Sequence, residues 1–260
     1  MPIIFSIPAV FAVFVFVFGL IIGSFLNCLI WRLYKDESLS GRSYCPKCRH
    51  MIAWYDNIPL LSFLLLRGKC RHCRAKISWQ YPLIELVTAV LFLVTFRADS
   101  LNPQFTLLLL RDWFLIITLL IVFVYDFRWQ LVPLRVVWFL GALIAILNIA
   151  LGIFWGTELF YIALGAAFFL IQYLLTKKKG IGEGDIWLGA LLGAAFPSGA
   201  HFLMIMVISY GLGAIVSLIL VSKMKKSWKS RIALGPFLVL GAIITLIWGE
   251  PILAWYLGLF

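Results

Sequence analysis

Eight apolar runs dominate this 260-residue sequence and restrict the fold more than any other feature. A full crossing of a bilayer takes about 20 apolar residues, a length that the runs 82–96 and 185–197 fit least well. Charged residues make up only 13% of the chain, whereas a soluble domain has about a quarter. We therefore expect an all-α polytopic membrane protein with about eight transmembrane helices, at residues 3–30, 82–96, 105–125, 134–154, 157–175, 185–197, 201–221 and 235–257.

The positive charges predict how these helices are oriented. If the N-terminus lies on the non-cytoplasmic side, four stretches become cytoplasmic, and they hold 20 of the 22 Lys and Arg residues: 31–81, 126–135, 176–184 and 222–234. The positive-inside rule requires this asymmetry, so we expect both termini on the non-cytoplasmic side. The first run lacks a basic start and a cleavage site, which favours a retained span over a signal peptide. The net charge of +11 is then explained by the basic residues that orient the helices and contact membrane lipid. We expect no nucleic-acid partner.

One polar insertion interrupts the apolar pattern and sets the predicted domains. Residues 1–30 form the first transmembrane helix, residues 31–81 a cytoplasmic loop, and residues 82–260 the membrane body. The loop is rich in Lys, Arg, Pro and Gly, and its stretch 76–79 has the composition of a short strand.

Four of the five cysteines lie in this loop as two Cys-x-x-Cys pairs: Cys45 and Cys48, then Cys70 and Cys73. Two such turns can direct four thiolates at one tetrahedral ion, so the loop is predicted to be a zinc knuckle. Gly68 lies two residues before the second pair, where a knuckle turn needs unusual backbone angles. With no open coordination position, the Zn2+ would be structural; free or redox-active thiols are the alternative.

Two aspartates lie where apolar runs meet the cytoplasmic boundary in this topology. Asp126 ends the third run and Asp185 opens the sixth, so both are predicted at the same membrane depth. Charged groups at such places are expensive and mark candidate functional sites. A pair of carboxylates that shares one proton can hydrolyse a peptide bond. Asp185 could instead be only the cap of its helix. Gly182 and Gly184 beside it would allow a close approach of the backbone.

Several motifs resemble those of the bacterial type IV prepilin peptidases, which are bifunctional leader peptidases and N-methyltransferases. Residues 182–185 read Gly-Glu-Gly-Asp, which resembles the Gly-x-Gly-Asp signature of intramembrane aspartyl proteases. The insertion and its flanks match in order, at residues 23–27, 42–48, 54–62, 66–73 and 77–85.

The resemblance implies a bacterial inner-membrane enzyme that cleaves the basic leader of type IV prepilins or pseudopilins at the cytoplasmic face. Asp126 and Asp185 would be its catalytic pair. The enzyme would then methylate the new N-terminal residue with S-adenosylmethionine, an activity associated with the N-terminal cytoplasmic region. We take as candidate contacts for that cofactor Gly23, Asn27, Arg32, Asp56, Gly68 and Glu85.

Some positions leave alternatives open. Glu85 could simply pair with Arg32, and Asp56 could be a turn former. Leu134 and Trp187 depart from the residues usual in the family, which leaves room for a methyltransferase with an impaired protease half. A non-enzymatic, zinc-anchored membrane scaffold is the remaining alternative.

Overall fold

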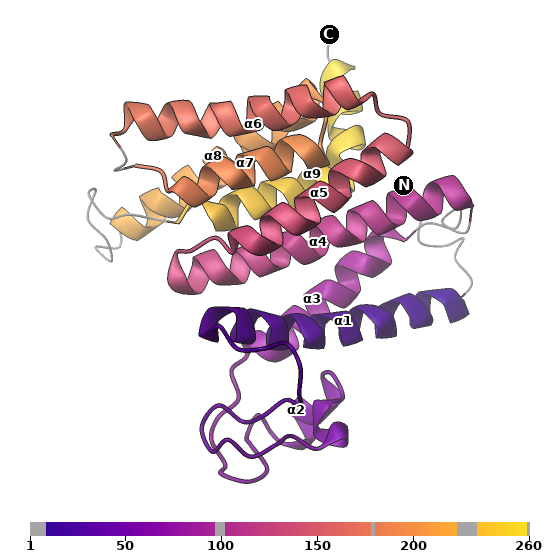
Figure 1. Cartoon of the computed structure of the whole chain (residues 1–260), viewed down its shortest axis with the longest axis vertical. Helices are drawn as coiled ribbons and strands as arrows, with labels where there is room; N and C mark the ends of the chain where they lie inside the picture. Colours follow the sequence, from indigo (N-terminus) through magenta and orange to yellow (C-terminus); the bar gives the residue numbers. More distant parts are fainter. Residues whose placement is uncertain (1–8, 97–101, 178–179, 223–232, 259–260) are drawn as a thin grey trace. The chain divides into compact units, whose positions relative to one another are not determined.

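The computed structural model describes residues 9–96, 102–177, 180–222 and 233–258 (Figure 1). Over these residues each of the eight apolar runs forms one helix, as predicted. Arg97 and the basic cluster at 223–231 lie outside the described residues, as do the first residues of the first run. The helices are α1 (Ala9–Lys35), η2 (Trp54–Asn57), α2 (Leu61–Leu65), α3 (Gln80–Thr95), α4 (Pro103–Trp129), α5 (Leu134–Ala150), α6 (Trp155–Leu175), α7 (Glu183–Ala195), α8 (Gly199–Ser222) and α9 (Gly235–Leu257).

Five of the described helices are long and apolar enough to cross a membrane: α1, α4, α6, α8 and α9. Helices α3 and α5 are apolar but shorter, and α7 has 13 residues. At about 1.5 Å per residue, α7 covers only about 20 Å of a hydrocarbon core that is about 30 Å thick. The chain is therefore an all-helical, multi-pass membrane protein, and the count of eight full crossings stays a prediction.

The chain divides into two compact units, residues 1–101 and 102–260. In the first unit, α1 packs along α3 through two glycines one turn apart. A Cβ on Gly19 would lie 2.5 Å from Ala89 Cα, and one on Gly23 would lie 2.6 Å from Glu85 Cα. Only glycine lets the two backbones come this close, which is a common device between membrane helices.

A buried arginine at the end of α1 organises the start of the loop that follows. Arg32 is 5% exposed, and its guanidinium donates hydrogen bonds to five successive carbonyl oxygens, those of residues 38–42. Because a guanidinium has five N–H donors and stays charged, burial is tolerable only when acceptors surround it. Arg32 thus fixes the path of the chain out of α1.

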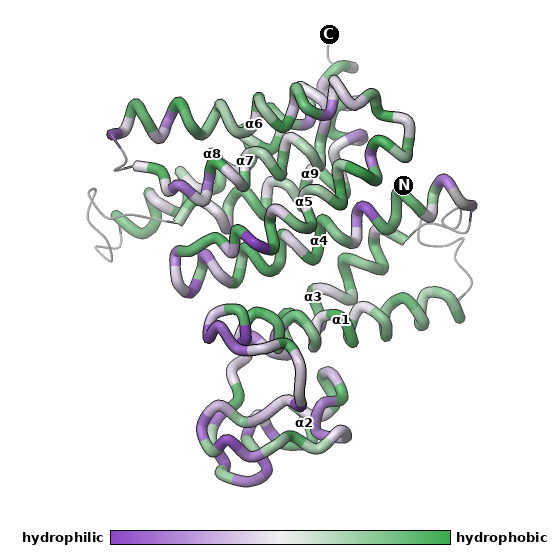
Figure 2. Tube along the Cα trace, viewed as in Figure 1, coloured by the Kyte–Doolittle hydropathy of each residue, from purple (hydrophilic) through white to green (hydrophobic). Residues whose placement is uncertain are grey.

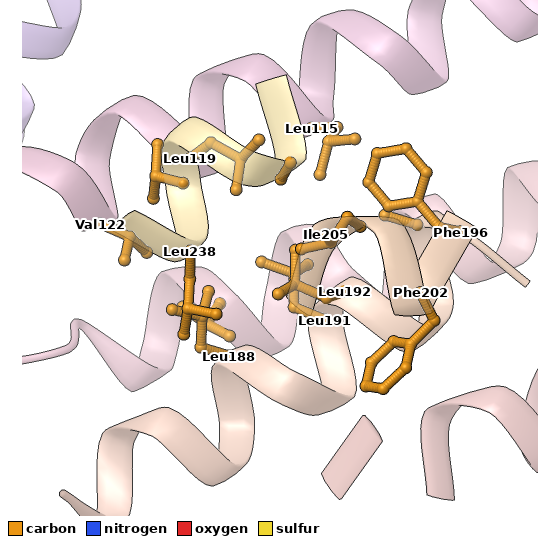
Figure 3. Packing of buried hydrophobic residues seen from close by; sticks show 14 of the residues in the cluster. Leu115, Leu119, Val122, Leu188, Leu191, Leu192, Phe196, Phe202, Ile205 and Leu238 are labelled. Atoms are coloured by element: carbon orange, nitrogen blue, oxygen red, sulfur yellow. The ribbon is translucent and has the colours of Figure 1, made fainter. Parts of the chain in front are cut away.

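The second unit contains α4 to α9, with α7 packed against α5, α6 and α9. Figure 3 shows Val122 of α4, Leu188 of α7 and Leu238 of α9 next to one another in its core. Close backbone approach again matters, because a Cβ on Gly189 or Gly193 of α7 would overlap the backbone of α6. The core of this unit thus joins α4, α7 and α9.

A buried polar network ties together four helices at one end of this unit. Asn148 of α5 donates to Glu158 of α6 at 3.2 Å and to the carbonyl of Ala194 in α7 at 2.7 Å. Arg111 of α4 donates to the Asn148 side-chain oxygen at 3.4 Å and forms an ion pair with Asp112 at 2.6 Å. Asn148 is fully buried and Glu158 is 1% exposed, so the network is shielded from its surroundings. Polar groups paired inside an apolar bundle hold the helices in one arrangement.

Candidate active site and metal centre

Asp126 lies in the last turn of α4 and is buried, with 7% of its surface exposed. The helix ends four residues later, where Gln130 takes a left-handed conformation with φ 53° and donates its N–H to the Asp126 carbonyl. The side-chain Oδ2 atom is buried and accepts no hydrogen bond from the described residues. A buried carboxylate oxygen without a partner is rare and calls for a functional explanation.

Asp185 lies in the first turn of α7 and is partly buried. Its Oδ2 atom accepts a hydrogen bond of 3.0 Å from the N–H of Gly182, which precedes the helix. Asp185 is thus not the N-cap itself, but as the third residue of α7 it bonds back to the N-cap residue Gly182 in a capping box. The cap uses one oxygen, and the charge of the carboxylate also acts on Asp126.

The packing of the core brings the two aspartates to the same end of the second unit. Asp126 follows Val122 by one turn, and Asp185 precedes Leu188 by one turn. Val122 and Leu188 belong to the same buried cluster, so one turn beyond each of them brings the two aspartates to the same end of that cluster. The two residues singled out in the sequence are therefore brought together.

A third element, the start of α9, completes this site and was missed in the sequence. Gly235 is the first residue of α9, and its N–H is directed at the Asp126 carboxylate. A Cβ on Gly235 would overlap Asp126 Oδ2 and lie 3.0 Å from its Cγ. The positive end of a helix dipole therefore faces the carboxylate. The sequence feature that could have indicated this element is the Gly-Pro step at residues 235–236, where the last apolar run begins.

The two glycines of the Gly-Glu-Gly-Asp sequence have different surroundings. A Cβ on Gly184 would overlap Val132, in the connection between α4 and α5, and would lie 2.7 Å from Val132 Cβ. A Cβ on Gly182 would lie 3.6 Å from Asp185 Oδ2, which is an ordinary contact. Gly184 therefore lets the chain that follows Asp126 pack over the first turn of α7, whereas Gly182 is not needed for space.

The two departures from the usual family sequence lie on adjacent helices next to this site. Trp187 of α7 packs edge-to-face with Trp138 of α5, with ring centroids 5.0 Å apart. Leu134 is the first residue of α5, one turn before Trp138. An aromatic contact thus occupies the position of Trp187, and both Asp126 and Asp185 are present beside these departures.

The four cysteines of the loop in the first unit come together as a candidate metal centre. One sulfur from each of Cys45, Cys48, Cys70 and Cys73 lies within 4.8 Å of the other three. The Sγ atoms of Cys45 and Cys73 are 3.8 Å apart, and a tetrahedral Zn2+ with bonds of about 2.3 Å separates its sulfurs by about 3.8 Å. The donor set fits a tetrahedral thiolate site.

The two Cys-x-x-Cys turns share one backbone design. An isolated antiparallel bridge closes each turn, Tyr44 with Met51 and Lys69 with Lys76. The next residue after each pair, Arg49 or Arg74, takes a left-handed conformation with φ 59° or 58°. Two like turns facing each other are what a shared ion requires.

The structure corrects the expected strand at 76–79 and gives Gly68 a different place in the loop. Among the described residues there is no strand, so the strand predicted at 76–79 is wrong, and only the bridge at Lys76 remains. Gly68 does have a left-handed backbone, with φ 65°, but its N–H bonds to the Phe63 carbonyl and ends α2. The left-handed positions of the knuckles belong to arginines, because each turn satisfies enough backbone groups to offset the strain.

The thiols differ in how readily they ionise. Backbone N–H groups of Cys73 and His72 lower the pKa of the Cys70 thiol to about 7. At Cys48 a backbone N–H of His50 favours the thiolate, but partial desolvation and the neighbouring thiols of Cys45 and Cys73 raise the pKa to about 11. Four thiolates at this distance repel one another, and a divalent cation removes that repulsion.

Three of the residues suggested as cofactor contacts lie along the contact of α1 with α3. Asn27 donates to the carbonyls of Gly23 at 3.2 Å and of Tyr81 at 3.1 Å, which joins the two helices. Glu85 does not pair with Arg32; its Oε2 accepts from the N–H of Leu60 at 2.8 Å. These polar groups hold the loop to the helix pair.

Asp56 forms an ion pair with Arg71, whose Nη2 lies 2.6 Å from Oδ1 and whose Nε lies 2.7 Å from Oδ2. The Arg71 guanidinium lowers the pKa of Asp56 below its ordinary value. Because Arg71 follows Cys70 directly, the pair braces the η2 segment against the second cysteine turn.

The comparisons with known proteins agree with this arrangement. Residues 17–98 match the bacterial peptidase A24 N-terminal domain, and residues 113–218 match the type IV leader peptidase family. The prepilin leader peptidase/N-methyltransferase of Aeromonas salmonicida is 33% identical over 97% of this chain and 96% of its own length. That of Stutzerimonas stutzeri is likewise 33% identical, over 97% and 96%. The protein of the same name from Myxococcus xanthus is 37% identical over 81% of this chain and 63% of its own length. No solved structure matches the chain.

Helical fold, paired aspartates and matched domains together define a multi-pass membrane peptidase. The chain belongs to the type IV leader peptidase family. The comparisons do not favour an impaired protease half or a non-enzymatic scaffold, because the peptidase match contains both Asp126 and Asp185.

Proposed function

We propose that Asp126 and Asp185 are the dyad with which this membrane peptidase removes the leader of a type IV prepilin or pseudopilin. The observation that carries the proposal is the buried, unpartnered Oδ2 of Asp126, which faces the start of α9 and the charge of Asp185. A carboxylate held this way is costly for the fold and suits proton transfer.

The chemistry follows from two carboxyl groups that share one proton. The ionised group takes a proton from water as the water oxygen bonds to the scissile carbonyl carbon. The protonated group gives its proton to the carbonyl oxygen. When the C–N bond breaks, the leaving amine takes a proton and the carbonyl re-forms, which returns one proton to the pair.

The loop of the first unit supports the second activity. The relatives carry the name N-methyltransferase, so we propose that this chain also methylates the new N-terminus with S-adenosylmethionine as donor. Cys45, Cys48, Cys70 and Cys73 would hold a structural Zn2+, which would fold the loop without a role in proton transfer. Arg32 and Asp56 are engaged in the loop itself, and we propose that they shape the donor site while Gly23, Asn27, Gly68 and Glu85 stay candidate contacts.

We further propose an inner-membrane location with the loop, and the end that holds the dyad, on the cytoplasmic side. The support is the asymmetry of the Lys and Arg residues, 20 of which lie in the four stretches assigned to that side. A basic leader would then meet the dyad at the membrane boundary where the substrate helix leaves the bilayer.

Cleavage of a co-expressed prepilin by the wild type, Asp126→Asn and Asp185→Asn tests the dyad. We expect each variant to lose cleavage, because an amide can neither take nor give the shared proton. Methylation of a pre-cut pilin should persist in both, which shows that the variants fold. Cleavage that survives in either variant would mean that the carboxylate has been misassigned.

A further inference from the structure

The loop between α1 and α3 exposes large apolar side chains that its own fold does not cover. The exposed fractions are 77% for Trp54, 68% for Leu64, 72% for Leu65 and 75% for Trp79. Trp54 belongs to η2, which contacts α2, and large apolar side chains exposed near one another mark an interaction site.

The leucines form one face of α2. Leu61, Leu64 and Leu65 stand at the spacing that places side chains on one side of a helix. The other side of α2 is the inner one, where Phe63 packs against Trp79 with ring centroids 4.9 Å apart. The helix is therefore fixed in orientation, and its leucine face points away from the body of the loop.

Positive charge predominates in the loop that carries this face. Residues 31–81 contain 10 Lys and Arg but only three acidic residues, and one of those, Asp56, is paired with Arg71. Arg67 and Lys69 follow α2 directly and are exposed. An apolar face with a basic edge complements an anionic lipid surface, where the side chains enter the boundary between head groups and acyl chains.

The position of α2 within the first unit also supports contact with the membrane. Both ends of the loop continue into apolar helices, α1 and α3. Figure 1 shows α2 within the loop that joins these two helices, and Figure 2 shows α1 as mainly hydrophobic. A segment joined at both ends to membrane helices stays within reach of the bilayer surface.

We propose that the leucine face of α2, with Trp54, is a membrane-binding surface that inserts into the bilayer interface. Arg67 and Lys69 bind anionic phospholipid head groups beside it. The loop thereby lies on the membrane and does not extend freely into the solvent.

The test is photo-crosslinking of the full chain in phosphatidylcholine nanodiscs with and without phosphatidylglycerol. The photoreactive residue p-benzoylphenylalanine replaces Leu64, or Trp54 if the first variant folds poorly. The matched control replaces Lys47, which is exposed on the first cysteine turn. Zinc content of each variant verifies that the loop is folded.

We expect lipid adducts severalfold more abundant at position 64 than at position 47. Arg67→Gln combined with Lys69→Gln should lower the share of phosphatidylglycerol among the adducts. Equal lipid labelling at both positions would overturn the proposal. So would cross-links from position 64 to residues 102–260 or to a second copy, because the face would then be a protein contact.

Discussion

Gly235→Ala is the sharpest test of how the dyad is built. The backbone of Gly235 is not in the left-handed region, so alanine fits its conformation, but the added Cβ would overlap Asp126 Oδ2. The neighbour that must move is a short, buried side chain whose Cβ is itself only 3.2 Å away. Rotation of the carboxylate would leave the close contact with Asp126 Cβ, so we expect the end of α4 or the start of α9 to shift.

The expected effect on stability is small and that on activity is large. Overpacking costs about 1–3 kcal/mol, and alanine in a helix regains up to about 1 kcal/mol over glycine. A net loss of about 2 kcal/mol leaves a typical protein almost wholly folded. A carboxylate displaced by about 1 Å loses about 100-fold in rate.

Cleavage of a prepilin, measured as kcat/KM, and thermal unfolding followed by tryptophan fluorescence report the two effects separately. Gly211→Ala is the matched control, because a Cβ there meets nothing within 4 Å. We expect Gly211→Ala to keep wild-type cleavage and Gly235→Ala to lose about 100-fold with a similar melting temperature. Wild-type cleavage by Gly235→Ala would refute the placement of α9 against Asp126.

Three further outcomes follow from the geometry. Gly184→Ala should lower cleavage and the melting temperature together, because its Cβ overlaps Val132, and an intact enzyme would show that the connection after α4 packs elsewhere. Cys70→Ser should reduce bound zinc, measured by mass spectrometry, from one ion per chain to a small fraction, and full retention would exclude a four-thiolate site. Asn148→Ala should destabilise the second unit by about 1–3 kcal/mol in denaturant unfolding, because Glu158 loses a buried donor; an unchanged midpoint would show that this network contributes nothing.

The sequence predicted most of the helices because apolar runs are a local signal. Each of the eight runs forms one helix, including 185–197, which becomes α7. Local patterns also located Asp126 and Asp185, since a charge at the edge of an apolar run is visible without knowledge of the fold. The four cysteines were found by spacing alone, and the structure places their sulfurs together.

What the sequence could not show depends on contacts between distant segments. Gly235 lies 109 positions after Asp126, and nothing in one dimension indicates that α9 starts against that carboxylate. Glu85 was suggested as a partner of Arg32, yet it accepts from the backbone of Leu60, and Arg32 instead binds carbonyls. Backbone groups carry no sequence signature, so side chains that bind them are hard to foresee.

The five carbonyl groups bonded to Arg32 have a consequence for the order in which contacts can form while the chain is being synthesised. All five acceptors lie within ten residues of the arginine, so the exit from α1 can close as soon as residue 42 has left the ribosome. Contacts that are near in sequence form early. The dyad, by contrast, is complete only when residue 235 has been added. The protein thus anchors its first membrane helix long before the proposed dyad can be assembled.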